Sequence, residues 1–241
     1  MKNSVIAFLF TLIMLQMYGQ KMDTLTPSKK VSYKAFLLPT VLISGGTLLL
    51  NSRLNTDLQE NFNTFFGENF HTYADNILLF APIAQIYAGK YFGFKSKNDF
   101  SQQTKNIAIA NTATLIIVDI LKHSIKEKRP DLSDNLSFPS GHTAIVFTNA
   151  ALLYQEYKDS NSWYASSGFV FATATGILRI ANNKHYTSDV LTGAGIGLAS
   201  GILVSHWNPF QSLKLGKNKK TSAILYPQLG NQTGLGLLAT F

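Results

Sequence analysis

The chain has 241 residues and no cysteine, with 46% hydrophobic and only 14% charged residues. The length suits one domain with a substantial core, and the lack of cysteine excludes disulfide frameworks, thiolate metal sites and cysteine nucleophiles. A net charge of +8 is compatible with an anionic membrane surface or a phosphorylated substrate. Nucleic acid is disfavoured as a partner, because the lysines are scattered over loops and the tail and form no stripe on one helix.

The first 20 residues are typical of a secretory signal. Lys2 precedes an apolar run over residues 5–14, and small and polar residues follow around Gly19 and Gln20. The alternative is an uncleaved anchor helix, since no clear small-x-small cleavage site ends the run. We expect export to the bacterial cell envelope and a boundary after residue 20.

Six apolar segments follow, and we interpret them as helices. They cover residues 35–50, 74–92, 107–121, 143–154, 163–180 and 190–207. Their lengths and the lack of period-two alternation argue against a sheet, whereas glycines and serines within them permit close helix packing. The expected fold class is all-α: a membrane-associated bundle of about six core helices within residues 21–207. Residues 51–73 are predicted to form a surface or interfacial helix.

The composition changes from residue 208 onwards. A basic linker with four lysines precedes two apolar stretches, residues 222–229 and 234–241, which Gly230 and Asn231 separate. This pattern predicts a short β-hairpin in a C-terminal tail over residues 208–241.

Three clusters of polar residues lie at the ends of apolar segments. The first is KHSIKEKRP, in which six residues separate Lys122 from Arg129, so that two cations can flank one oxyanion. Alone, this cluster is more typical of a solvated or headgroup-facing basic helix end. The second cluster, PSGH, places Ser140, Gly141 and His142 at the start of a helix. Ser140 can cap that helix, its first N–H groups can bind a phosphate, and His142 can act as a general acid. The alternative is a capping turn with a surface histidine.

The third cluster contains Arg179, His185 and Asp189 within RIANNKHYTSD. A helical turn would place His185 and Asp189 on one face, where the carboxylate fixes the ring tautomer and leaves the other nitrogen free to attack phosphorus. A histidine and an aspartate at this spacing are also common as a cap or a surface salt bridge. The three clusters in this order are more specific than any one of them.

Together the three clusters resemble the tripartite signature of the type 2 phosphatidic acid phosphatase superfamily. The resemblance covers residues 122–189 and implies hydrolysis of a phosphate monoester or diphosphate through a phosphohistidine, with no metal and no other cofactor. It implies that His185 is the nucleophile, that Asp189 orients it and that His142 protonates the leaving group. The phosphate-binding residues that it implies by position are Lys122, Arg129, Ser140, Gly141 and Arg179.

The resemblance leaves the substrate open. A membrane-associated lipid phosphatase is favoured, with phosphatidate, phosphatidylglycerophosphate, undecaprenyl diphosphate or lipid A as substrate, because apolar segments border the clusters. The alternatives are a soluble periplasmic acid phosphatase of the same superfamily, a vanadate-dependent haloperoxidase and a non-catalytic lipid-binding protein. Leu178 stands where many members carry serine, and we expect this departure to tune binding without abolishing the chemistry.

The export signal and the distribution of lysines each favour a periplasmic active site, but they require incompatible topologies. Six spans with the basic residues 21–34 inside would put all three clusters outside. A cleaved signal would put the mature N-terminus outside, and the same six spans would then put the clusters in the cytoplasm. We expect a periplasm-facing site and leave the number of spans open.

Overall fold

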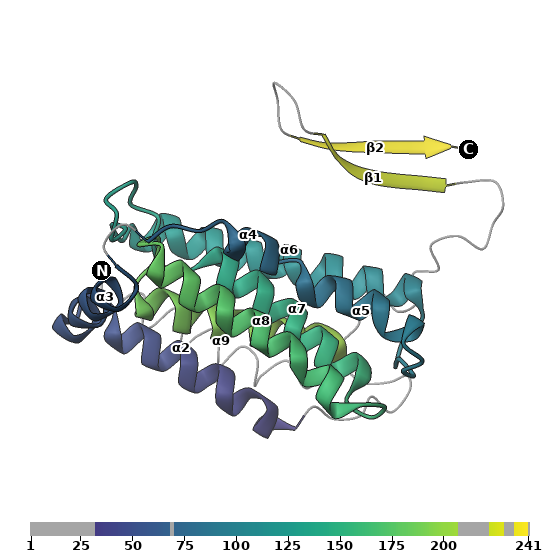
Figure 1. Cartoon of the computed structure of the whole chain (residues 1–241). Helices are drawn as coiled ribbons and strands as arrows, with labels where there is room; N and C mark the ends of the chain where they lie inside the picture. The colour runs from purple at the N-terminus through teal and green to yellow at the C-terminus, as the bar shows by residue number, and fades with distance from the viewer. Residues whose placement is uncertain (1–31, 68–69, 207–221, 229–233, 241) are drawn as a thin grey trace. The chain divides into compact units, whose positions relative to one another are not determined.

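The computed structural model describes residues 32–67 and 70–206, together with the backbone of residues 222–228 and 234–240. It divides the chain into two compact units, Met1–Trp207 and Asn208–Phe241. The long helices of the first unit run alongside one another (Figure 1). The predicted signal over residues 1–20 lies outside the described residues.

In the described part of the first unit, all the regular secondary structure is helical. The helices are η1 (Tyr33–Phe36), α2 (Leu37–Leu49), α3 (Arg53–Phe66), α4 (Ala74–Leu78), α5 (Ala81–Tyr91), α6 (Phe100–Ile125), α7 (Gly141–Tyr157), α8 (Ser162–Ala181) and α9 (Thr187–His206). The all-α class is thus confirmed, and every predicted apolar segment contains a helix. The predicted surface helix within residues 51–73 is α3, although its Asn55 and Gln59 are buried.

One predicted segment, residues 74–92, is divided into α4 and α5. Pro82 lies in the first turn of α5, where a missing N–H group is harmless. In one continuous helix, the same proline would leave the carbonyl oxygen of Leu78 without its donor. The separate α4 contacts α7 and α8, and this position brings it to the site described below.

Helix α7 lies at the centre of the first unit and contacts α5, α6, α8 and α9. Its approach to α9 is close because Gly193 and Gly201 of α9 face the carbonyl oxygens of Ser140 and Thr148. A Cβ atom on either glycine would lie 2.6 Å from the oxygen that it faces, so space requires glycine at both positions. Since Ser140 immediately precedes α7, this packing also sets the distance between the PSGH cluster and α9.

Polar residues occupy the N-cap positions of α6 and α7. At the start of α6, Asp99 Oδ1 accepts a hydrogen bond from the Gln102 N–H group at 2.7 Å, a typical N-cap. Ser140 occupies the N-cap position of α7, as predicted, but its side chain makes no capping hydrogen bond. Its hydroxyl instead accepts a hydrogen bond from Thr143 Oγ1 at 2.9 Å. The predicted position is therefore confirmed, and the predicted side-chain interaction is wrong.

Two described helices, α6 and α9, are long and apolar enough to cross a membrane, and the bent pair Tyr33–Leu49 and Arg53–Phe66 would add a third if it forms one span. This is fewer than the six spans considered from the sequence, whose number was left open. Helices α2, α5 and α7 have 13, 11 and 17 residues. Each of these helices alone is shorter than the roughly 20 apolar residues of a typical span.

The second unit contains the predicted hairpin. Strands β1 (Ser222–Gln228) and β2 (Gly234–Thr240) pair antiparallel, with Ser222 opposite Thr240 and Gln228 opposite Gly234. The two-stranded ladder confirms the hairpin that was predicted from two apolar stretches separated by Gly230 and Asn231.

Candidate active site

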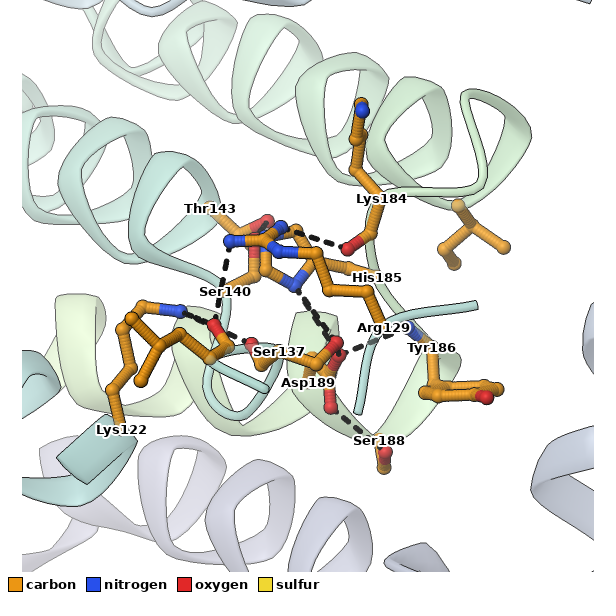
Figure 2. A network of polar contacts seen from close by, with 12 residues as sticks. Lys122, Arg129, Ser137, Ser140, Thr143, Lys184, His185, Tyr186, Ser188 and Asp189 are labelled. Carbon is orange, nitrogen blue, oxygen red and sulfur yellow. Dashed lines mark hydrogen bonds and ion pairs between the residues drawn. The ribbon is translucent and has the colours of Figure 1, made fainter. Parts of the chain in front are cut away.

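Four helix ends and two loops, one between α6 and α7 and one between α8 and α9, bring the three predicted clusters together. Lys122 comes from the last turn of α6, His142 from the first turn of α7, Arg179 from the last turn of α8 and Asp189 from the first turn of α9. His185 lies in the loop between α8 and α9. Figure 2 shows side chains of the first and third clusters grouped around the ring of His185.

His185 is 2% exposed, and both of its ring nitrogens have partners. Nδ1 lies 3.2 Å from Asp189 Oδ2, and Nε2 lies 3.2 Å from Arg129 Nη1 (Figure 2). A guanidinium can only donate, so Nε2 carries the lone pair and Nδ1 carries the proton. Burial lowers the pKa of His185 to about 4, although Asp189 opposes the shift. The ring is therefore neutral near neutral pH, in the tautomer that an Nε2 nucleophile requires.

The carboxylate of Asp189 is fixed by three donors besides the histidine. Ser137 Oγ donates to Oδ2 at 2.5 Å, and the Tyr186 N–H group donates to the same oxygen at 2.9 Å. Ser188 Oγ donates to Oδ1 at 3.1 Å. These bonds prevent the carboxylate from rotating, so it holds His185 in one orientation. The predicted contact between the two residues is present, although His185 lies just before α9.

Two cations of the first cluster border the same space. Arg129 Nε donates to Asp134 Oδ1 at 2.7 Å, and its Nη1 donates to the Lys184 carbonyl oxygen at 2.9 Å. These partners fix the plane of the guanidinium. Lys122 Nζ donates to the carbonyl oxygen of Leu136. Because this partner of Lys122 is a neutral carbonyl group, the charge of the lysine remains available to an anion.

Arg179 and His142 are both bound by the short helix α4. Arg179 Nη1 donates to Asp75 Oδ2 at 2.7 Å, and the two side chains are 11% and 2% exposed. Arg179 Nε has no hydrogen-bond partner among the described residues, so the guanidinium retains a donor for a phosphate. His142 Nε2 lies 2.9 Å from Asn76 Oδ1. Burial, and next the charge of Arg179, lower the pKa of His142 to about 4.

Ser140 and Gly141 lie at the start of α7, as predicted. The Ser140 N–H group donates to the carbonyl oxygen of Asp189 at 3.0 Å, which ties the second cluster to the third. A Cβ atom on Gly141 would meet one described neighbour, Val118 Cγ1, at 3.7 Å. That is an ordinary van der Waals distance, so packing within the described residues does not require glycine there.

Sequence reasoning missed several residues that support the site. Ser137 and Ser188 bind Asp189 directly, as described above. Asn55 of α3 is 3% exposed; its Oδ1 accepts a hydrogen bond from the Ser188 N–H group at 3.0 Å, and its Nδ2 donates to Ser188 Oγ at 2.9 Å. No local pattern could reveal this contact, because 133 residues separate the two partners.

Glu127, within the first cluster, was also missed. Its Oε2 atom is buried and receives no hydrogen bond from any described donor. Burial, and next the negative charge of Asp189, raise the pKa of Glu127 well above its usual range. A protonated Glu127 can donate to Asp189, and two adjacent carboxyl groups that share one proton avoid a buried repulsion. Its place between two lysines in a basic loop gave no signal of this role.

The chemistry of the site suits an anion. No group of three or more His, Asp or Glu side chains is placed to hold a metal ion in residues 32–67 and 70–206. The side chains around His185 are mainly cations and hydroxyl groups. Donors fixed in this way stabilise negative charge that develops on phosphoryl oxygens.

Known proteins share the region that carries these residues. The profile of the PAP2 superfamily matches residues 104–212, which include all three clusters. The lipid A 1-phosphatase of Porphyromonas gingivalis is 34% identical over 171 residues, which cover 70% of this chain and 37% of that protein. A PA-phosphatase related-family protein of Dictyostelium discoideum is 26% identical over 153 residues, covering 53% of this chain and 56% of that protein. This chain thus spans less than two thirds of either relative.

One solved structure is also similar. The crystal structure of Aquifex aeolicus LpxE aligns with a TM-score of 0.49 at 22% sequence identity. The alignment covers 65% of this chain and 98% of that chain.

Proposed function

Because this chain belongs to the PAP2 superfamily, we propose that it is a lipid phosphatase that hydrolyses a phosphate monoester or diphosphate through a phosphohistidine. The observation that carries the proposal is the state of His185. Its Nε2 lone pair lies beside the Arg129 guanidinium, and its Nδ1–H is bound to the buried Asp189. A neutral imidazole in a cationic pocket is suited to attack a phosphorus atom.

In the first step, His185 Nε2 attacks phosphorus and the bond to the leaving oxygen breaks. His142 gives its proton to that oxygen, so the lipid leaves as an alcohol or as a lipid with one phosphate fewer. The positive charge that develops on the His185 ring is stabilised by Asp189. The phosphoryl oxygens are bound by Lys122, Arg129 and Arg179 and by the start of α7, at Ser140 and Gly141.

In the second step, water attacks the phosphohistidine. His142, now neutral, takes a proton from the water, and the electron pair of the N–P bond returns to His185 Nε2. Inorganic phosphate then leaves. Neither step requires a metal ion or an organic cofactor.

A lipid substrate is supported by the surface beside His142. Tyr73, Ile77 and Phe80 are 71%, 73% and 62% exposed, and they lie in and next to α4, the helix that binds His142. An exposed apolar row next to a polar site fits a phosphate attached to acyl chains. Among the candidate lipids, the similarity to a lipid A 1-phosphatase favours lipid A.

The proposed location is the periplasmic face of a bacterial membrane. Lys122 lies near the C-terminal end of α6 and Asp189 near the N-terminal end of α9, the two described helices that are long enough to span. If both cross the membrane, their site ends lie on the same face. With the signal-like residues 1–20 exporting the N-terminus, the C-terminal end of α6 faces the periplasm when the bent pair Tyr33–Leu49 and Arg53–Phe66 also forms one span.

The test is phosphate release by the purified full chain in detergent with EDTA. The substrates are lipid A, phosphatidate, undecaprenyl diphosphate and a soluble aryl phosphate, and the variant is His185→Ala. The matched control is His123→Ala, an exposed histidine paired with Asp119 on α6. We expect release that persists in EDTA, is fastest with a lipid and is lost only in His185→Ala. With a substrate radiolabelled in its phosphate, rapid quenching should trap the label on the wild-type protein. Unchanged release in His185→Ala would contradict the assignment, and a preference for the aryl phosphate would favour the soluble acid phosphatase.

A further inference from the structure

Helix α4 contacts two residues of the proposed mechanism although it lies outside residues 104–212, the region that the PAP2 profile matches. Its Asp75 binds Arg179, and its Asn76 binds His142. We propose that Asn76 is a positioning residue, which orients the ring of His142 while leaving the ring able to release its proton. This inference rests on the proposed function, because orientation matters only if His142 transfers a proton.

Two sets of buried contacts hold α4 in place. The ion pair between Asp75 and Arg179 is almost fully buried, and separating it would leave an unpaired charge in the protein interior. Just before α4, the Thr72 N–H group donates to Asn182 Oδ1, and Asn182 Nδ2 donates to the Thr72 carbonyl oxygen, both at 2.9 Å. Asn182 ends α8. These contacts attach α4 to the end of α8, so Asn76 has a defined position at the exposed rim of the site.

The contact between Asn76 and His142 defines a tautomer. Asn76 Oδ1 lies 2.9 Å from His142 Nε2, and an amide oxygen can only accept a hydrogen bond. His142 Nε2 therefore carries a hydrogen in both the neutral and the charged ring. The proton that is gained and lost during the reaction is then the one on Nδ1.

The two histidines of the site have partners of different charge, and each partner suits the proposed role. His185 contacts a carboxylate, Asp189, which stabilises the positive ring that forms when the nucleophile is phosphorylated. A carboxylate beside His142 would instead raise its pKa and retain the proton that a general acid must give away. The neutral amide of Asn76 orients the ring without this effect.

The experiment compares Asn76→Ala, Asn76→Asp and the control Asn61→Ala, since Asn61 is an exposed asparagine on α3. For each full-length variant, kcat and KM for phosphate release from a lipid substrate in detergent are measured as a function of pH, together with the Tm. We expect Asn76→Ala to lower kcat about tenfold, the usual effect of one lost hydrogen bond, with little change in KM or Tm. We expect Asn76→Asp to shift the alkaline limb of kcat upwards by about one pH unit, because the carboxylate stabilises the protonated ring.

The pH profile of Asn76→Asp decides the proposal even if Asn76→Ala is unstable. An alkaline limb at the wild-type position in Asn76→Asp overturns it, and so does a kcat of Asn76→Ala equal to that of Asn61→Ala. Lack of phosphate release by the wild-type protein would instead refute the proposed function. The two failures are therefore distinguishable.

Discussion

Arg129 Nη1 and His185 Nε2 lie 3.2 Å apart, so the guanidinium occupies the side of the ring from which the proposed nucleophile would attack. Its other partners, Asp134 and the carbonyl oxygen of Lys184, hold it there at 2.7 and 2.9 Å. A phosphate oxygen carries more negative charge than an imidazole nitrogen and is the better acceptor for a guanidinium. Arg129 can thus keep the Nε2 lone pair in place before substrate binds and donate to the phosphate afterwards.

Replacement of Arg129 by lysine should separate geometry from charge. A lysine retains the positive charge but cannot bind Asp134, Lys184 and a phosphate with fixed donors in one plane. We expect Arg129→Lys to lower kcat/KM for phosphate release about 100-fold, in the range found when one fixed donor to a developing oxyanion is removed. Lys128→Ala, which removes an exposed cation next to Arg129, is the control and should remain near wild type. Full activity in Arg129→Lys would mean that Arg129 acts only through its charge.

The pH dependence should differ between the free protein and its complex with substrate. Burial lowers the pKa of both His142 and His185 to about 4 in the free site, so both rings are neutral near neutral pH. His185 is then ready to attack, but His142 lacks the proton that it must donate. The negative charge of a bound phosphate favours protonated His142 and raises its pKa. We expect the alkaline limb of kcat, which reports the complex, at higher pH than that of kcat/KM, by about one to three units.

Profiles of kcat and kcat/KM against pH for the wild type and His142→Asn test this expectation. The alkaline limb should disappear from the residual activity of His142→Asn. Two limbs at the same pH in the wild-type protein would contradict the effect of bound phosphate on His142.

Glu127→Gln should stabilise the protein as the pH rises. The pKa of Glu127 is raised in the folded state, so the folded protein retains a proton that the unfolded chain releases above the usual glutamate pKa. Stability is therefore lost progressively as pH rises from that value towards the raised pKa. Glutamine cannot ionise, and its amide can still donate to Asp189. We expect the Tm of Glu127→Gln to exceed that of wild type by about 2–4 °C at mildly alkaline pH.

The difference in Tm should vanish at low pH, where glutamate is protonated in both states. Activity should stay close to wild type in Glu127→Gln and fall in Glu127→Ala, which has no donor for Asp189. Equal loss of activity in both variants would show that an amide cannot replace the carboxyl group of Glu127.

Gly193→Ala should disturb the packing that joins two of the clusters. A Cβ atom there would lie 2.6 Å from the carbonyl oxygen of Ser140, a backbone atom that cannot rotate away. We expect a loss of about 1–3 kcal/mol in the free energy of unfolding, typical of overpacking, and reduced activity. Gly45→Ala in α2 is the matched control, because nothing lies within 4 Å of its added Cβ. The free energy of unfolding of both variants is measured by denaturation in the same detergent. Equal values would mean that α7 and α9 can move apart without cost.

Much of the fold and part of the site could be predicted from local features of the sequence. Apolar segments without period-two alternation predicted the helices, and the turn residues near Gly230 predicted the hairpin, because these features depend on neighbours along the chain. The pair His185 and Asp189 could be found because four residues span about one helical turn. The division of residues 74–92 was missed, although Pro82 lies inside this segment and a proline is tolerated only in the first turn of a helix.

The sequence by itself thus determined the helical class, the order of the three clusters and the types of charged group that they contain. Only the tertiary structure decided which distant groups support them. Asn76 and His142 are 66 residues apart, and Asp75 and Arg179 are 104 residues apart. Such contacts depend on how α4 packs against α7 and α8, and an aspartate or asparagine in a short helix has no local pattern that distinguishes this position from an exposed one. The raised pKa of Glu127 is likewise a product of burial beside Asp189, which exists only after the chain has folded.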